Sequence, residues 1–188
     1  MSTIARLTLE QYERMIEAGV FDSDEPKRIE LIHGELREMT PIGPPHLLAV
    51  DLLLNRWVMQ IQMPKGVWVR VQSPLGFASQ KSAPEPDMSW IAERDYSRSR
   101  LNADDVFLVI EVAESSLNFD RGEKADLYAS AGVKDYWIVN LVKKRVEVYR
   151  EPRDGRYQSV ESFSPGAEVR PLAFPELVLP VELLFGGK

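Results

Sequence analysis

The stretch VFLVIEVAESS, residues 106–116, decides the fold of this 188-residue chain. Six of its first seven residues are apolar and β-branched types are prominent, which predicts a strand that is buried on both faces. Glu111 lies inside this apolar run. Because a buried carboxylate costs several kcal/mol unless its charge is compensated, the sequence predicts a partner that faces Glu111.

The segments around this strand predict a single α/β domain, residues 1–188, with a mixed sheet and helices packed on it. Apolar spacing and capping residues predict helices over three segments: 8–19, 44–62 and 119–132. Alternating runs predict a β-hairpin over 27–40, around His33 and Gly34. Further strands are expected over 67–73, 75–79, 88–92, 106–112, 135–140, 145–150 and 156–163, and the tail is expected to add a short strand and an apolar turn.

Two of the helices carry specific expectations. The second should turn a stripe of apolar residues toward the core: Leu47, Val50, Leu54, Trp57, Val58 and Ile61. The third should be capped by Asn118 or Asp120 and should end at Gly132.

The composition excludes several kinds of site. The chain has no cysteine and two histidines, so a thiolate site or a three-histidine zinc site within one chain is excluded, and any metal must be held mostly by oxygen. No apolar run approaches the roughly 20 residues that a membrane span needs. The first residues lack the apolar core of a signal peptide, so a cytoplasmic location is expected. A net charge of -6 argues mildly against an extended duplex-binding surface.

Three charged residues fall where a plain core would avoid them. Asp87 immediately precedes a predicted strand, Glu111 lies near the end of the next one, and Lys124 lies in the following helix. Lys124 shares a helical stripe with Leu127, Tyr128 and Ala131, so if that stripe packs on the sheet its ammonium points inward or along the interface. Position alone would also let the side chain extend to water, but a partnership with Glu111 is at least as plausible. Two carboxylates at neighbouring strand ends suit Mg²⁺, and an adjacent lysine would stabilise the charge that develops on a phosphate. These parts together suit phosphodiester hydrolysis.

A purely structural interpretation stands beside this one. Glu111 could pair with Lys124 in a structural salt bridge, and Asp87 could turn the chain after Pro86. Spacing alone leaves the two interpretations evenly matched.

At these residues the chain resembles the Uma2-like family of restriction-endonuclease-like proteins, formerly a domain of unknown function, in the PD-(D/E)XK nuclease superfamily. The resemblance runs from about residue 8 onward and rests on the following blocks: ELIHGELREMTP (30–41), PHLLAV (45–50), EPDMSWI (85–91), VFLVIEVAESS (106–116), DRGEKADLYASAGVKDYWIVN (120–140), RVEVYR (145–150) and FPELVLPVELLF (174–185).

The resemblance implies a restriction-endonuclease-like core and a nuclease site that uses Mg²⁺, with Mn²⁺ as a substitute. Asp87 would be the aspartate of the PD motif, and Glu111 the second acid, with the Val112 carbonyl as a further ligand. In the common pattern the lysine stands two residues after that acid, where this chain has Ala113. The family takes it from the following helix, which points to Lys124.

Two accessory residues also follow from the resemblance. Glu35 matches a further acidic position of the family and would serve as an accessory catalytic acid. His46 matches a recurrent histidine and would contact the substrate or Glu35.

The expected function is Mg²⁺-dependent hydrolysis of DNA by an endonuclease. Two alternatives remain open: a binding or regulatory protein with a silent site on the same fold, and a phosphohydrolase that acts on a small molecule. DNA is the expected partner, with no membrane. A homodimer is expected because duplex cleavage needs two sites and a domain this small offers little surface for DNA. The apolar segment 177–185 would serve such an interface or the core.

Overall fold

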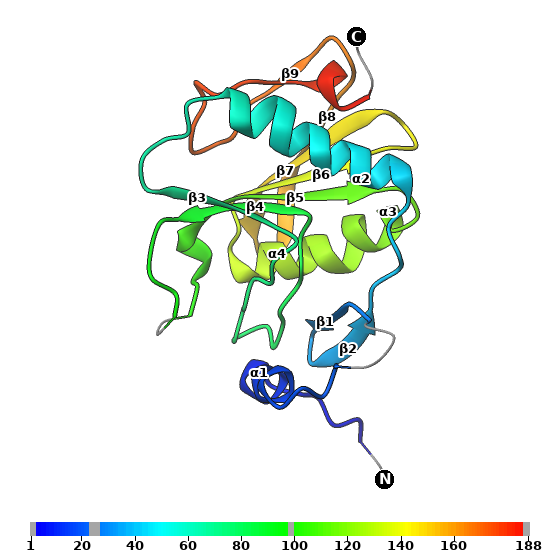
Figure 1. Ribbon diagram of the computed structural model, residues 1–188, viewed down its shortest axis with the longest axis vertical. Helices are drawn as coiled ribbons and strands as arrows, with labels where there is room; N and C mark the ends of the chain where they lie inside the picture. Colours follow the sequence, from blue (N-terminus) through cyan, green and yellow to red (C-terminus); the bar gives the residue numbers. More distant parts are fainter. Residues whose placement is uncertain (1–2, 23–26, 98–99, 186–188) are drawn as a thin grey trace.

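Figure 1 shows a computed structural model of the chain, which describes residues 3–22, 27–97 and 100–185. Within these residues a six-stranded sheet has the order β3-β4-β5-β6-β7-β8. Strands β5 and β6 run parallel, and the other neighbouring pairs run antiparallel. The predicted mixed sheet is therefore confirmed. Its strands are β3 Val67–Val71, β4 Met88–Ala92, β5 Val106–Ala113, β6 Asp135–Asn140, β7 Arg145–Arg153 and β8 Arg156–Phe163.

Helices cover both faces of the sheet (Figure 1). One face carries α2 (Pro44–Asp51), which continues as a π-helical turn η1 (Leu52–Trp57) and a 3₁₀ turn η2 (Val58–Gln60). The other face carries α3 (Leu117–Phe119), the π-helical turn η4 (Asp120–Lys124) and α4 (Ala125–Ala131), which follow one another directly. None of the described helices is long and apolar enough to cross a membrane.

Strand β5 supplies both halves of the core, as its sequence predicts. Leu108, Ile110 and Val112 join the cluster under α2, where Trp57 stacks on Trp90 with a centroid distance of 5.0 Å. Because alternate side chains of a strand point to opposite faces, Val109 joins the cluster under α4, and Glu111 is directed to that same face.

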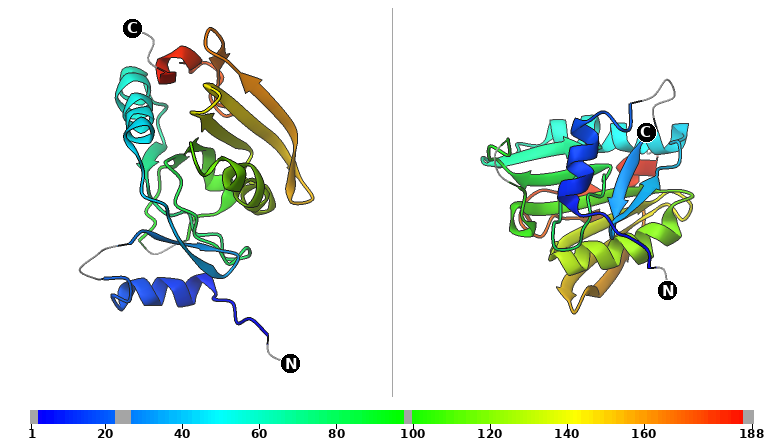
Figure 2. Two further views of the ribbon diagram at one scale, coloured as in Figure 1. Left: turned by 90° about the vertical axis from the view of Figure 1, so that its right-hand side faces the viewer. Right: turned by 90° about the horizontal axis from the view of Figure 1, so that it is seen from below.

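The N-terminal segment forms a layer of its own beside the sheet (Figure 2). It contains α1 (Leu9–Glu17) and the hairpin of β1 (Ile29–Ile32) and β2 (Glu35–Glu38). Thr8 caps α1 by accepting a hydrogen bond from the Gln11 N–H. The hairpin turns at His33 and Gly34, which have φ angles of 50° and 81°, so the glycine fits a position that most side chains avoid.

The second helix departs from the prediction at one position. Val50, Trp57 and Val58 are buried as expected, but Leu47 is 47% exposed, and Leu53 is fully buried instead. The buried stripe is centred on Val50, Leu53 and Trp57. Leu47 lies three residues before Val50 and falls at the margin of that stripe, in the first turn of the helix.

Two other local predictions were wrong. Residues 75–79 form no strand; they enter a tight loop in which Phe77 and Ser82 exchange backbone hydrogen bonds. The alternation predicted there reflects two side chains that pack inward without a neighbouring strand, Leu75 and Phe77. The third helix begins at Leu117 after Ser116, so neither Asn118 nor Asp120 caps it. It ends at Gly132 as predicted, with a φ angle of 92°.

The C-terminal segment closes the core under α2. It contains β9 (Glu168–Val169), which the sequence did not predict, β10 (Leu179–Pro180) and the 3₁₀ turn η5 (Val181–Phe185). The apolar side chains of this segment are buried in the cluster under α2, namely Leu177, Leu179, Val181 and Leu184. These side chains therefore serve the core.

A buried carboxylate on β7 anchors the sheet to the helix that covers it. Glu147 is 2% exposed and accepts hydrogen bonds from Arg121 Nε at 2.8 Å, Asn140 Nδ2 at 2.8 Å and Arg145 Nε at 2.9 Å. Burial alone raises the pKa of Glu147, but the hydrogen bonds from Arg121, Asn140 and Arg145 outweigh it and lower this pKa to about 2.

The stability that Glu147 contributes should therefore depend on pH. A carboxylate with a lowered pKa in the folded state stabilises the protein above its unfolded pKa, and this contribution is lost as the pH falls toward 2. Glu147→Gln should lower the free energy of unfolding by roughly 3 kcal/mol more at pH 6 than at pH 2. Urea unfolding at both pH values measures this difference. Glu161→Gln, an exposed change on β8, is the control, and an equal cost of Glu147→Gln at the two pH values would contradict the account.

Candidate active site

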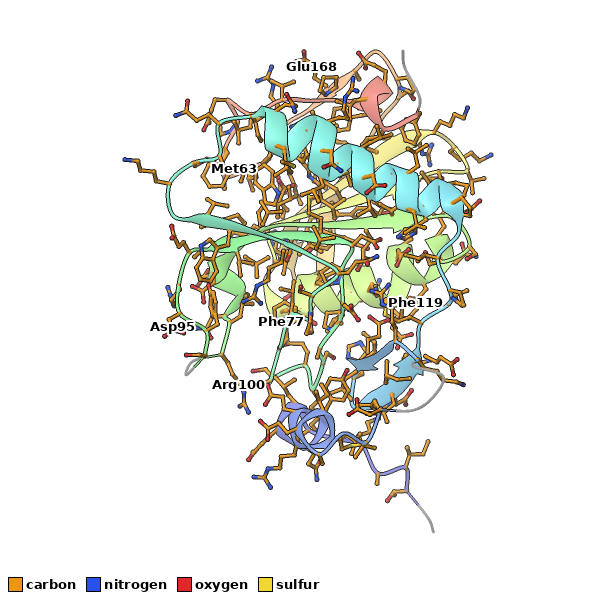
Figure 3. All side chains as sticks on the ribbon, viewed as in Figure 1. Met63, Phe77, Asp95, Arg100, Phe119 and Glu168 are labelled. Atoms are coloured by element: carbon orange, nitrogen blue, oxygen red, sulfur yellow. The ribbon has the colours of Figure 1, made fainter. Side chains whose placement is uncertain are left out.

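A cavity of about 390 Å³ opens at the end of β5. One wall is the β1–β2 hairpin with the residues that lead into α2, and the opposite wall is the segment that joins β5 to α3. Figure 3 draws the side chains on the ribbon and labels Phe119, which lies between the helices and the hairpin. Asp87, Glu111 and Lys124 all line this cavity, as does His46. The structure thus brings together the three residues that the sequence selected, with one of the two accessory residues.

Glu111 and Lys124 form a buried ion pair. Both are less than 5% exposed, and Lys124 Nζ lies 3.0 Å from Glu111 Oε1. The Tyr128 hydroxyl donates to the same oxygen at 2.9 Å, and burial raises the pKa of Tyr128 so that it keeps its proton. Both hydrogen bonds to Glu111 in the described part of the chain fall on Oε1, so Oε2 is available to a ligand.

Asp87, which immediately precedes β4, lines the same part of the cavity as Glu111 and Lys124. Antiparallel pairing of β4 with β5 sets Met88 opposite Ile110, which brings Asp87 next to the acid-bearing end of β5. The Val112 N–H donates to Asp87 Oδ2 at 2.8 Å. His46 Nε2 lies 2.7 Å from Asp87 Oδ1, so this histidine contacts Asp87 and not Glu35.

Glu35 lies outside the cavity. Its carboxylate pairs with Arg6 at 3.2 Å and with Arg37 at 2.9 Å, nearer the turn of the hairpin than Glu30. The acid that the hairpin does place on the cavity floor is Glu30, which is 3% exposed and lies 3.3 Å from Lys124 Nζ. Glu30 also accepts a hydrogen bond from the Glu85 N–H at 3.2 Å.

Sequence reasoning missed Glu30 and Asp120. Glu30 interrupts an apolar strand just as Glu111 does, and this signal could have identified it. Asp120 was interpreted as a helix cap, although it stands one helical turn before Lys124 on the same face. It is 2% exposed, accepts a hydrogen bond from Ser116 Oγ at 2.6 Å, and has a pKa that burial raises to about 6.

The cavity floor carries an excess of buried negative charge. Among the described residues that line it, four carboxylates that are at most 6% exposed share one buried cation, Lys124; the four are Glu30, Asp87, Glu111 and Asp120. Burial raises the pKa of Glu111 well above its ordinary value, although Lys124 opposes the shift. Burial also lowers the pKa of Lys124, but the surrounding carboxylates outweigh it and the pKa is raised. A divalent cation would relieve this imbalance.

The donor set fits a hard cation of a particular kind. No three acidic or histidine side chains in the described ranges converge as a complete metal cage. Mg²⁺ does not need one, because it is commonly bound through one or two carboxylates and keeps several of its waters. Asp87 and Glu111 with the Val112 carbonyl match that mode of binding.

Comparisons with known proteins identify the fold and the family of this chain. A crystal structure described as "a putative nuclease belonging to DUF820", from Anabaena variabilis ATCC 29413, superposes with a TM-score of 0.66 at 18% identity. The match covers 95% of this chain and 97% of that one, so the two share a fold, and the expected nuclease-like core is confirmed. No curated protein matches. The model of the Uma2 family, described as "Putative restriction endonuclease", matches residues 9–182, and the chain therefore belongs to the Uma2 family.

Proposed function

We propose that this protein is a metal-dependent endonuclease that hydrolyses phosphodiester bonds in DNA. The observation that carries the proposal is the convergence of Asp87, Glu111 and Lys124 on the floor of one cavity, from two strands and a helix. Membership of the Uma2 family, which is described as "Putative restriction endonuclease", supports nuclease activity. The excess of buried negative charge supports a divalent cation, and Mg²⁺ or Mn²⁺ is the natural choice for oxygen ligands.

Each residue has a distinct part in the proposed reaction. Asp87 and Glu111 would hold the ion with the Val112 carbonyl, and a bound Mg²⁺ supplies an activated water and stabilises charge on the phosphate. Lys124 would place its ammonium beside the scissile phosphate, where negative charge develops.

The neighbouring side chains keep these groups in position. His46 holds Asp87 through its hydrogen bond to Oδ1, and Tyr128 fixes the carboxylate of Glu111. Glu30 takes the place that Glu35 was expected to fill, because it holds Lys124 from the hairpin side.

One rival function has an observation of its own. A cavity of about 390 Å³ with deeply buried acids also suits a hydrolase of small phosphodiesters. A binding protein with a silent site is disfavoured, because a binding role does not require Asp87, Glu111 and Lys124 to be buried together in one cavity. The choice of substrate in the assay below separates these functions.

The proposal includes one domain and a homodimer. Glu30 of the hairpin and Glu111 of the central sheet bind the same lysine, which supports treating both parts as one unit. A pair of subunits would present two sites, one for each strand of a duplex that has been opened. Light scattering at micromolar concentration measures the mass directly, and a monomer would remove the dimer from the proposal.

The first prediction of this proposal concerns activity. Glu111→Gln nearly preserves shape but removes the charge of a proposed ligand, so nicking of plasmid or single-stranded DNA with Mg²⁺ or Mn²⁺ should fall roughly 100-fold or more. Glu161→Gln on the exposed face of β8 is the matched control and should cleave as the natural protein does. EDTA should abolish cleavage in every sample.

Other outcomes of that assay would change the assignment. Equal cleavage by both variants would point to a contaminating enzyme and remove Glu111 from the site. Hydrolysis of bis(p-nitrophenyl) phosphate without any cleavage of DNA would favour the small-molecule hydrolase. No turnover with any metal, from protein whose circular dichroism shows it folded, would favour the binding protein.

The second prediction concerns metal affinity and pH. Carboxylates bind a metal in their deprotonated form, and burial raises the pKa of Glu111, so Mn²⁺ binding should displace protons. Affinity should therefore rise with pH until Glu111 is deprotonated in the metal-free protein, by up to about tenfold per pH unit for each proton released. Calorimetry in two buffers of different ionisation enthalpy counts the protons. Glu111→Gln should flatten the pH dependence, whereas a flat profile in the natural protein would exclude a protonated ligand.

A further inference from the structure

The shape of the cavity limits which DNA can reach the proposed ligands. Asp87 and Glu111 are 6% and 4% exposed, so the scissile phosphate must enter the cavity to meet them. A volume of about 390 Å³ is at the small end of the range for ligand sites and is closed on two sides by the hairpin and by the segment after β5. The phosphates of an intact duplex lie along the edges of wide grooves in a rigid double helix. A single flexible strand could thread a phosphate into such a space.

The hairpin wall carries two arginines in addition to the acids. Arg28 and Arg37 both line the cavity, and they are the described bases on that wall. Arg28 Nη2 lies 2.9 Å from Glu85, and the Arg28 side chain is 35% exposed, so it is partly accessible. Two guanidinium groups beside a nuclease centre are suited to the backbone phosphates next to the scissile one.

Arg37 carries the more specific signal. Its Nη2 pairs with Glu35 at 2.9 Å and with Glu123 at 3.2 Å. Its Nε is buried and has no hydrogen-bond partner among the residues that the structure describes. A buried donor without a partner is unfavourable, and a phosphate oxygen would satisfy it once the side chain turned to expose Nε. The terminal nitrogen beside Nε is Nη2, which already contacts Glu35 and Glu123, so a phosphate bound through two hydrogen bonds at this edge would compete with those carboxylates.

An aromatic ring lies among the groups that line the cavity. Phe119, labelled in Figure 3, lies between the helix and the hairpin, and it is only partly buried. Its ring centroid is 5.8 Å from Lys124 Nζ. Proteins that bind single strands combine cationic groups for the backbone with aromatic rings on which bases stack. The lining of the cavity contains both kinds of group.

We propose that the cavity takes a single DNA strand, not an intact duplex, with Arg37 and Arg28 binding a backbone phosphate and Phe119 stacking against a base. This inference deepens the proposed nuclease function and rests on it for the identity of the ligand. In this arrangement two guanidinium groups bind a phosphodiester anion and one aromatic ring stacks on a base.

The test measures strand binding apart from turnover. A fluorescein-labelled 12-nucleotide DNA strand is titrated by anisotropy with Ca²⁺ in place of Mg²⁺, beside an RNA strand of the same sequence and a covalently closed duplex. Arg37→Ala should weaken binding of the DNA strand roughly tenfold. It should also reduce the slope of log affinity against log salt by about 0.7, which is the signature of one lost phosphate contact on a single strand.

Arg6→Ala is the matched control. Arg6 pairs with Glu35 as Arg37 does, but it lies outside the cavity and is exposed, so its removal should change neither affinity nor slope. Arg37→Lys keeps the charge and loses the two-pronged contact, so it should keep the salt slope and lose part of the affinity. Phe119→Leu should weaken binding roughly tenfold without changing the slope, because stacking does not involve counterions.

Several results would overturn the proposal. Equal binding of the closed duplex and the single strand would remove the strand preference, and equal behaviour of Arg37→Ala and Arg6→Ala would remove the phosphate contact. Tighter binding of RNA than of DNA would overturn the assignment to DNA.

Failure of the nuclease function would look different. Cleavage would then be absent with every metal, while strand binding that depends on Arg37 persisted. Conversely, metal-dependent cleavage of closed duplex at the rate of single strands would sink this inference and leave the nuclease standing.

Discussion

The buried pair of Glu111 and Lys124 is the interaction on which the rest of this structure depends. It joins the central strand to the helix above it, and through Glu30 it reaches the N-terminal hairpin. Two charges that have left water attract strongly, but they repay their desolvation only when the geometry is good and the other donors are satisfied. The lysine has acidic partners on two sides, whereas the carboxylates outnumber it. Removing the lysine alone would leave several buried anions uncompensated, at a cost of about 3–5 kcal/mol or more.

This imbalance connects stability with function. A fold selected only for stability would replace such a cluster with apolar side chains, which pack equally well and carry no desolvation cost. The cluster persists under two apolar layers, one rich in tryptophan under α2 and one rich in tyrosine under α4. These layers hold the carboxylates in place when no cation relieves their repulsion. The packing of the sheet therefore offsets the repulsion between the carboxylates on the cavity floor.

Much of this arrangement could be predicted from the sequence, because the central polar residues interrupt strong apolar patterns. Glu111 inside an apolar strand and Lys124 on an apolar helical stripe each violate a local rule, and their partnership follows from the mutual need for compensation. Asp87 was selected from its place before a predicted strand, but its contact with the end of β5 depends on the antiparallel register of β4 and β5, which local patterns do not specify. The order of the strands in the main sheet was likewise beyond any local signal.

The errors have physical causes of the same kind. Glu35 and Glu30 stand five residues apart on one hairpin, and only the docking of that hairpin on the sheet decides which carboxylate enters the cavity. Asp120 has the side chain of a helix cap, but the helix begins earlier and a π-helical turn carries the aspartate inward. Residues 75–79 alternate like a strand yet have no neighbour to pair with. In each case tertiary contacts override a correct local pattern.

The position of Lys124 has a consequence for how such sites arise. In the common arrangement of the superfamily the ammonium comes from two residues beyond the acid, a place that Ala113 occupies in this chain within the packed core. A side chain at that position and one from the helix can approach the same carboxylate, because alternate strand residues and the covering helix share one face of the sheet. The proposed chemistry requires an ammonium group at one position beside the carboxylate. It does not require that the lysine come from a particular place in the sequence. A lysine can thus migrate from strand to helix through an intermediate that carries both, without any loss of charge at the centre.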